Sequence, residues 1–276
     1  MRRGLYSPGT TDTFAHHRAR VHSHLTHLGY ALGWWPSRTP APRVVRLLRG
    51  DISVADAEAI AVSANPLLEG TARSSHWRFA GRKNADGAVR AAGGQSLAYN
   101  SARLRDTVGP LEIGSAETTR AGGSLRARWV VHCVAPDAIA RSEAEHAVYL
   151  RNPQAFSGEL DLRLESTFDA AIDAATSLRA RSLALPAIGC GIRAFPQERA
   201  GACAFRAAAR WLRLDPPCAD RLQRVDFVIF SDAVWNAWPT CAMEALGEPT
   251  SRHASKDVSE LFAWHADQGK GRRTTG

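Results

Sequence analysis

The stretch Pro186-Ala187-Ile188-Gly189-Cys190-Gly191-Ile192-Arg193-Ala194-Phe195-Pro196 places two glycines between an apolar run and a helical pattern. The run before it, Ser182 to Pro186, predicts a short buried strand, and the pattern after it predicts a helix from about Gln197 to Leu212. The glycines free the backbone to turn its N–H groups toward an anion such as a diphosphate. The helix that follows can add the positive end of its dipole. No Gly-Lys-Ser/Thr follows the glycines, so this is not a Walker loop.

Apolar runs alternate with helical patterns along the rest of the chain. Strands are predicted at 44–48, 59–62, 129–134, 182–186 and 225–230, and helices at 85–92, 160–178, 197–212 and 234–246. Short apolar strands separated by helices pair in parallel and carry helices on both faces of the sheet. The predicted fold class is therefore α/β, a three-layer α/β/α sandwich with a mixed, mostly parallel central sheet.

Composition limits the possible classes of protein. Hydrophobic residues make up 45% of the 276 residues and charged residues 22%, as in an ordinary soluble domain. No apolar run approaches the ~20 residues that span a bilayer, so we expect no membrane partner. Half of the net charge of +8 lies in residues 1–42, which hold five Arg and one Asp. Such a basic end is more typical of a solvated or targeting segment than of a nucleic-acid site.

Polar residues are predicted at the carboxyl ends of other strands, where ligands of parallel sheets bind. Asp51, in Arg49-Gly50-Asp51-Ile52-Ser53, can accept a hydrogen bond from an exocyclic amine or can cap a turn. Asn65, after Val62-Ser63-Ala64, can orient a hydroxyl group or a water, or can cap its own turn ahead of Pro66. Cys190 has no assignable His–acid partner, so we interpret it as a small loop residue and not as a nucleophile.

In this order and at these spacings, the motifs resemble those of the macrodomain family from about Val44 to Leu246. Gly50-Asp51-Ile52-Ser53 is similar to Gly-Asp-Ile-Thr, and Val62-Ser63-Ala64-Asn65 keeps the last Asn of Asn-Ala-Ala-Asn. The other matches are residues 86–93 to Asp-Gly-Ala-Ile-His-x-Ala-Gly, residues 130–136 to Val-Ile-His-x-Val-Gly-Pro, residues 186–196 to Pro-Ala-Ile-Ser-Thr-Gly-Ile-Tyr-Gly-Tyr-Pro, and residues 228–232 to the final strand.

The resemblance implies a module that binds ADP-ribose and assigns a role to individual residues. Asp51 would bind the adenine amine with Ile52 beside it, and Phe230 would stack on the adenine. Asn65 would hold the distal ribose. In hydrolysing members, the acid at Asp86 positions or activates a water near the anomeric carbon, so Asn65 and Asp86 are the candidate catalytic residues. The alternative role for Asp86 is a helix N-cap. Gly189, Cys190, Gly191, Ile192 and Arg193 would wrap the diphosphate, largely through backbone N–H groups, and Phe195 would close over the distal ribose.

The sequence departs from the family pattern around the diphosphate. An insertion runs from Glu69 to Ala85, and Gly81 alone stands where the family has a run of glycines. Arg82 and Lys83 can reach the diphosphate with charge-assisted hydrogen bonds, or can face water on a surface loop. In the glycine loop, Arg193 replaces an aromatic residue and Ala194 replaces a glycine.

Two functions are consistent with these residues. The first is hydrolysis of ADP-ribosyl esters, either as a mono-ADP-ribosyl-protein hydrolase or as an O-acetyl-ADP-ribose deacetylase. The second is a non-catalytic reader of ADP-ribose or of ADP-ribosylated proteins, which the lost glycine run favours. Neither needs a metal or a cofactor. A nucleic-acid-binding function rests on charge alone, and we expect no nucleic-acid partner.

Three segments are predicted: a basic, disordered leader at 1–42, a macrodomain at 43–247 and a polar tail at 248–276. The Arg-rich, acid-poor start also resembles an organellar transit peptide, which is the alternative for the leader. An odd number of scattered cysteines fits reduced thiols in an intracellular reducing compartment, cytoplasm or nucleus. These cysteines are Cys133, Cys190, Cys203, Cys218 and Cys241.

Overall fold

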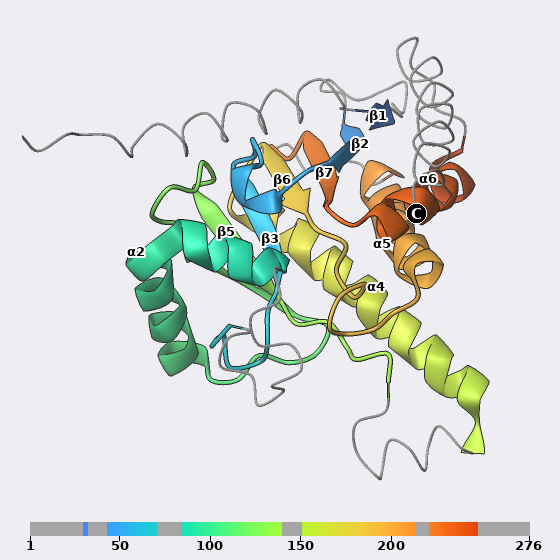
Figure 1. Ribbon diagram of the computed structural model, residues 1–276, viewed down its shortest axis with the longest axis horizontal. Coiled ribbons are helices and arrows are strands. Elements are labelled where there is room, and N and C mark those ends of the chain that lie inside the picture. The colour runs from blue at the N-terminus through green and yellow to red at the C-terminus, as the bar shows by residue number, and fades with distance from the viewer. Residues whose placement is uncertain (1–29, 33–42, 71–83, 140–150, 214–220, 248–276) are drawn as a thin grey trace, which may run out of the picture.

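The computed structural model describes residues 30–32, 43–70, 84–139, 151–213 and 221–247. Within these residues the strands form one seven-stranded sheet in the order β1-β2-β7-β6-β3-β5-β4 (Figure 1). Neighbouring strands from β2 to β5 in this order pair in parallel, while β1 and β4 pair antiparallel at the two edges. The strands are β1 Tyr30–Leu32, β2 Val44–Arg49, β3 Ala59–Ser63, β4 Ala116–Arg120, β5 Trp129–Cys133, β6 Ser182–Leu185 and β7 Arg224–Ile229.

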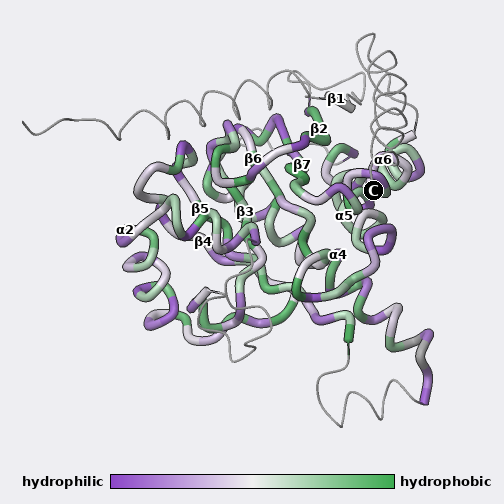
Figure 2. Tube along the Cα trace, in the orientation of Figure 1, coloured by the Kyte–Doolittle hydropathy of each residue, from purple (hydrophilic) through white to green (hydrophobic). Residues whose placement is uncertain are grey.

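Helices cover both faces of this sheet, so the predicted three-layer α/β/α sandwich is confirmed. One face packs against α2 and the short 3-10 helix η1, and the other packs against α4, α5 and α6. Hydrophobic residues lie along the central strands between these layers (Figure 2). The helices are α2 Ala85–Val108, α4 Pro153–Ser177, α5 Gln197–Arg213 and α6 Asp232–Leu246, with η1 at Ile52–Val54.

Alternate residues of each central strand enter opposite cores, as the two-residue period of a strand requires. Ile60 and Val130 contact the α2 side, whereas Ala61 and Val131 belong to the core on the other side. That larger core contains Phe168, Phe205, Phe227 and Trp238, whose rings meet edge to face with centroids 4.9 to 6.2 Å apart. Both faces are buried, which explains why these strands are continuous apolar runs in the sequence.

The structure adds two strands and most of one helix to the predicted elements. Strand β4 was not predicted because Ala-Glu-Thr-Thr-Arg is a polar edge segment, and β1 lies inside the predicted leader. The helix predicted at 85–92 continues to Val108 as α2, which bends at Gly94 (Figure 1). The rest of residues 1–42 and the predicted tail 248–276 lie outside the described residues. Among the described helices, none combines the length and the apolar character that crossing a membrane requires.

The bend in α2 depends on a backbone conformation that only glycine adopts readily. Gly94 has φ 59° and ψ −152°, and no atom lies within 4 Å of the position that a Cβ would take. We expect Gly94→Ala to lower the free energy of unfolding by about 1–3 kcal/mol through backbone strain alone. The matched control is Gly158→Ala in α4, an equally open glycine without a positive φ. It should raise stability by about 0.5–1 kcal/mol. Urea denaturation measures both, and equal effects would contradict the role of the bend.

Candidate functional site

Five parallel strands bring their carboxyl ends to one edge of the sheet, which we call the strand-end edge. The segments that leave β2, β7, β6 and β3 there contain, in sheet order, Asp51, Phe230, the glycine loop 186–196 and Asn65. Backbone bonds continue the pairing beyond the strands, because Gly50 N–H donates to Ile229 O at 2.9 Å and Ala64 N–H donates to Cys133 O at 2.8 Å. The residues predicted to bind a ligand from four distant parts of the chain therefore meet along one line.

Asp51 and Phe230 stand at the β2–β7 end of this edge. The Asp51 carboxylate caps η1, since its Oδ1 accepts from both the N–H and the hydroxyl of Ser53 at 2.8 Å. Ile52 is 4% exposed and belongs to the core on the α2 side. Phe230 is 71% exposed, so its ring is available to a ligand. The turn-capping role considered for Asp51 is present, and both of these hydrogen bonds use Oδ1. Contact with an adenine amine stays a prediction.

The glycine loop is a tight turn with several inward backbone bonds. Gly189 has φ +94°, and a Cβ there would lie 3.2 Å from the side chain of Leu164. Ala194 adopts φ +58° where the family element has glycine. The N–H groups of Ile188, Cys190, Ala194 and Phe195 are used within the loop. Among the described residues, no backbone acceptor faces the N–H groups of Gly189, Gly191 or Arg193.

The Arg193 side chain holds the glycine loop to the ends of β3 and β5. Its guanidinium donates to Asp137 Oδ2 at 3.0 Å and to Ala64 O at 3.1 Å, and its own carbonyl accepts from Ala138 N–H at 2.8 Å. Both side chains of the ion pair are largely buried. The guanidinium therefore already has a carboxylate partner within the protein, and contact of Arg193 with the diphosphate stays a prediction.

Phe195 lies away from solvent. Its side chain is 2% exposed and belongs to the large core, with the Arg199 guanidinium 5.6 Å from the ring centroid. Packing accounts for this position, and contact with a distal ribose stays a prediction.

Burial makes Cys190 an unreactive thiol. Desolvation raises its pKa to about 12, which leaves almost no thiolate at neutral pH. This agrees with its interpretation as a small loop residue.

The two candidate catalytic residues lie near the β3 end of the edge. Asn65 binds its own turn: its Nδ2 donates to Gly70 O at 3.3 Å and its Oδ1 accepts from Glu69 N–H at 3.1 Å. Asp86 is in the first turn of α2 and is 4% exposed. The N-cap alternative for Asp86 is wrong, because Asn84 is the N-cap and accepts from Gly87 N–H at 2.8 Å.

Arg90 and Asp137 contact predicted site residues but were not predicted. Arg90 Nε donates to both carboxylate oxygens of Asp86 at 3.1 Å. The spacing of four residues on a predicted helix was a signal for this pair. The sequence holds no comparable signal for Asp137, which is 56 residues from its partner Arg193. Arg82 and Lys83 lie outside the described residues, as do residues 71–83 of the predicted insertion from Glu69 to Ala85.

His132, on β5, is a buried polar group opposite Val62 of β3. It is 1% exposed, and its Nε2 lies 2.9 Å from Thr119 Oγ1, while Nδ1 has no partner among the described residues. Burial lowers the pKa of His132 to about 3, with a further contribution from the charge of Arg90. The imidazole is therefore neutral at physiological pH.

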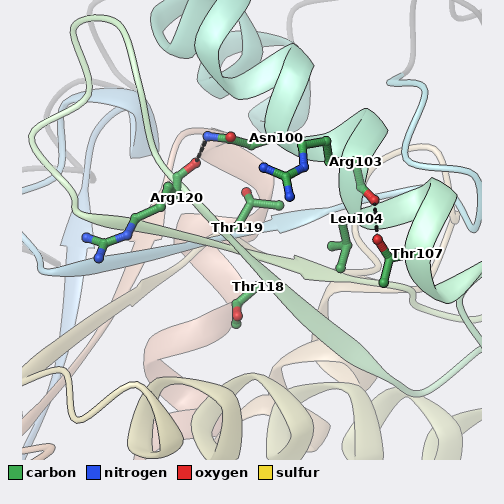
Figure 3. A pocket seen from close by; sticks show the side chains of 7 residues that line it. All are labelled: Asn100, Arg103, Leu104, Thr107, Thr118, Thr119 and Arg120. Atoms are coloured by element: carbon green, nitrogen blue, oxygen red, sulfur yellow. Dashed lines mark hydrogen bonds between the residues drawn. The ribbon is translucent and has the colours of Figure 1, made fainter.

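A separate polar pocket of about 240 Å³ lies against the edge strand β4 (Figure 3). Its hydrogen bonds join Asn100 Nδ2 to Arg120 O at 3.0 Å and Thr107 Oγ1 to Arg103 O at 2.8 Å. It lies beside the second half of α2 and does not include the residues of the strand-end edge. The lining residues are Asn100, Arg103, Leu104, Thr107, Thr118, Thr119 and Arg120.

Buried neutral His132 should make the fold sensitive to acid. An unfolded histidine titrates near 6.5 and folded His132 near 3, so between these values the unfolded chain binds a proton that the folded chain does not. Stability from this group is complete above pH 6.5 and falls as the pH drops, by up to about 1.4 kcal/mol per pH unit. Between pH 6.5 and pH 5, the free energy of unfolding of His132→Gln should therefore fall by about 2 kcal/mol less than that of wild type. Urea denaturation at both pH values tests this, and parallel losses in the two proteins would refute it.

Comparison with known proteins identifies relatives of this chain. A family model described as Macro domain matches residues 74–204. A macro domain-containing protein of Vibrio parahaemolyticus is 30% identical over 198 residues, which are 70% of this chain and 94% of that protein. The ADP-ribose glycohydrolase MACROD1 of Mus musculus is 30% identical over 178 residues, which are 64% of this chain and 46% of that protein.

A solved structure shares the fold. A macrodomain mutant of Oceanobacillus iheyensis with ADPR superposes with a TM-score of 0.57 at 19% identity. The match covers 73% of this chain and 92% of that chain.

Proposed function

The chain belongs to the macro domain family, and from this premise we propose that it binds ADP-ribose at the strand-end edge and hydrolyses ADP-ribosyl esters. The substrate would be a mono-ADP-ribosylated protein or O-acetyl-ADP-ribose. The observation that carries the proposal is the line formed by Asp51, Phe230, the glycine loop and Asn65 across neighbouring strands. The relative named ADP-ribose glycohydrolase supports the hydrolytic part.

The sheet order matches the order of groups in the ligand. From β2 through β7 and β6 to β3 is three strand spacings, or about 14 Å. Asp51 and the exposed ring of Phe230 would receive the adenine at one end. The backbone N–H groups of Gly189, Gly191 and Arg193 would bind the diphosphate in the middle. The distal ribose would then lie beside Asn65, at the end nearest to Asp86.

In hydrolysis of an ADP-ribosyl ester, a water would add its oxygen to the anomeric carbon. The bond from that carbon to the ester oxygen breaks, and the carboxylate of the target leaves. Asp86 would orient this water and accept its proton, a role suited to a carboxylate close to the reacting carbon. Asn65 would hold the ribose in place. For O-acetyl-ADP-ribose, the water would attack the acetyl carbonyl carbon instead. The bond from that carbon to the ribose oxygen would break, the ribose oxygen would take a proton and leave as the hydroxyl of ADP-ribose, and the acetyl group would become acetate.

A non-catalytic reader is the second candidate, and one observation favours it. Asp86 is 4% exposed and Arg90 Nε–H contacts both of its oxygens. A carboxylate held in this way has fewer lone pairs left for a water. A reader of free ADP-ribose or of ADP-ribosylated proteins would need only the groups at the adenine and diphosphate positions. An intracellular reducing location remains part of the proposal for either function.

The proposed contact between Asp51 and adenine can be tested by comparing ADP-ribose with an analogue that lacks the exocyclic amine. Asp51→Ala should weaken ADP-ribose binding at least ~10-fold in calorimetry, since a hydrogen bond to a charged group contributes about 1.5–3 kcal/mol. Replacing adenine by hypoxanthine removes the exocyclic amine, so wild type should bind this analogue less tightly than ADP-ribose. Asp51→Ala should discriminate less between the two ligands.

The control for this test is Ser53→Ala, which removes a hydroxyl bonded to Asp51 and keeps the carboxylate. It should keep most of the affinity and the preference for adenine. If Asp51→Ala binds ADP-ribose as tightly as wild type, the assignment of Asp51 is wrong.

The hydrolytic role of Asp86 can be tested by release of ADP-ribose from an automodified protein. Asp86→Asn keeps the shape of the side chain and removes the base, so kcat should fall by ~10²-fold or more. Affinity for free ADP-ribose should change little. Asp106→Asn, an exposed position at the other end of α2, should act like wild type. If wild type binds ADP-ribose but releases none from the substrate, the reader is the function; equal turnover by Asp86→Asn would remove Asp86 from the mechanism.

A further inference from the structure

One guanidinium joins the two candidate catalytic residues. Arg90 lies one helical turn after Asp86 on α2 and donates from Nε to both Asp86 oxygens at 3.1 Å. Its Nη2 donates to Leu68 O at 2.7 Å, in the loop that follows β3. The carboxylate is 4% exposed and the Arg90 side chain 21%, so these bonds are largely shielded from water. Arg90 therefore fixes the start of α2 against the loop that contains Asn65.

The loop is folded tightly around this guanidinium. Leu68 N–H donates to Asn65 O at 3.0 Å, and Asn65 Nδ2 donates to Gly70 O at 3.3 Å. Leu68 holds a left-handed φ of +53° with its side chain 2% exposed, a strained conformation that the surrounding contacts maintain. A Cβ at Gly70 would lie 2.7 Å from Arg90 Cδ and Nε. The path from Asn65 through Gly70 and Leu68 to Arg90 and Asp86 is continuous.

We propose that Arg90 is a positioning residue that sets the distance and orientation between Asn65 and Asp86. The inference rests on the proposed function, because those two residues are its candidate catalytic groups. The planar guanidinium presents N–H groups in fixed directions, so it can hold a carboxylate and a carbonyl at the same time. A lysine has the same charge on a single flexible ammonium and cannot keep both contacts in this geometry. The family element that residues 86–93 resemble has His where this chain has Arg90. We call the contacts of Arg90 with Asp86 and with Leu68 the clamp.

The variants separate geometry from charge. Arg90→Lys keeps the positive charge and loses the planar guanidinium that contacts Asp86 and Leu68 together. Gly70→Ala keeps Arg90 but forces a methyl group into its side chain and an alanine into a left-handed φ of +79°, so it disturbs the clamp from the loop side. The matched control is Arg163→Gln on α4, which breaks another ion pair of the same i,i+4 spacing, to Glu159, where both side chains are at least half exposed. Melting curves establish that each protein is folded.

The measurements are kcat and KM for release of ADP-ribose, calorimetric affinity for ADP-ribose, and amide hydrogen exchange of residues 65–70. In Arg90→Lys and Gly70→Ala, we expect the amide hydrogens of residues 65–70 to exchange faster. We also expect kcat to fall by ~10- to 100-fold while KM stays within about twofold, because misplacing a catalytic group slows chemistry more than binding. Arg163→Gln should match wild type in all three. A purely structural role would lower the melting temperature without this separation of kcat from KM.

The possible results distinguish failure of the proposed function from failure of the positioning role of Arg90. If wild type neither binds ADP-ribose nor releases it, the proposed function fails. If wild type turns over and Arg90→Lys has the same kcat and the same exchange in the loop, the positioning role of Arg90 is overturned. If wild type binds without turnover, faster exchange of residues 65–70 in both variants at unchanged affinity for ADP-ribose supports the positioning role of Arg90, and unchanged exchange overturns it.

Discussion

The parallel register of the five central strands is the constraint on which the candidate site depends. Because β2, β7, β6, β3 and β5 run in one direction, their following segments all emerge at the same edge of the sheet. An ion pair with a buried carboxylate helps to fix this register, since Arg46 on β2 lies opposite Asp226 on β7 and binds it at 2.6 and 2.7 Å. A shift by one residue would exchange the side chains that enter the two cores and separate Asp51 from Phe230.

Much of the fold could be predicted because its central strands are buried on both faces. Strands such as β3 and β5 are apolar at nearly every position, which is a strong local signal. The edges gave no such signal. The polar strand β4 has one neighbour, β5, and β1 is three residues long. The continuation of α2 past Gly94 was hidden because the backbone there leaves the helical conformation, and the exposed residues that follow lack an apolar stripe.

Candidate residues of the site could be predicted from the sequence more easily than the side-chain pairs that they form. The resemblance to family motifs gave Asp51, Asn65 and Asp86 as candidates, and the helix spacing could have paired Asp86 with Arg90. The pairing of Arg193 with Asp137 depends on how two strand ends meet, so no local pattern shows it. Phe195 illustrates a related limit: an aromatic residue beside a predicted ligand loop can point into the core as well as toward the ligand, and here it packs in the core.

The exposure of Phe230 has a thermodynamic consequence for any ligand that reaches this edge. Its ring is 71% exposed beside the end of β2, although most other aromatic side chains of the described domain are covered. A flat base stacked on that ring removes apolar surface from water, and such burial gives association a negative heat-capacity change. Capture of a phosphate group by backbone N–H groups alone buries little apolar surface. The temperature dependence of the binding enthalpy therefore distinguishes a nucleotide seated on Phe230 from an anion held only by the glycine loop.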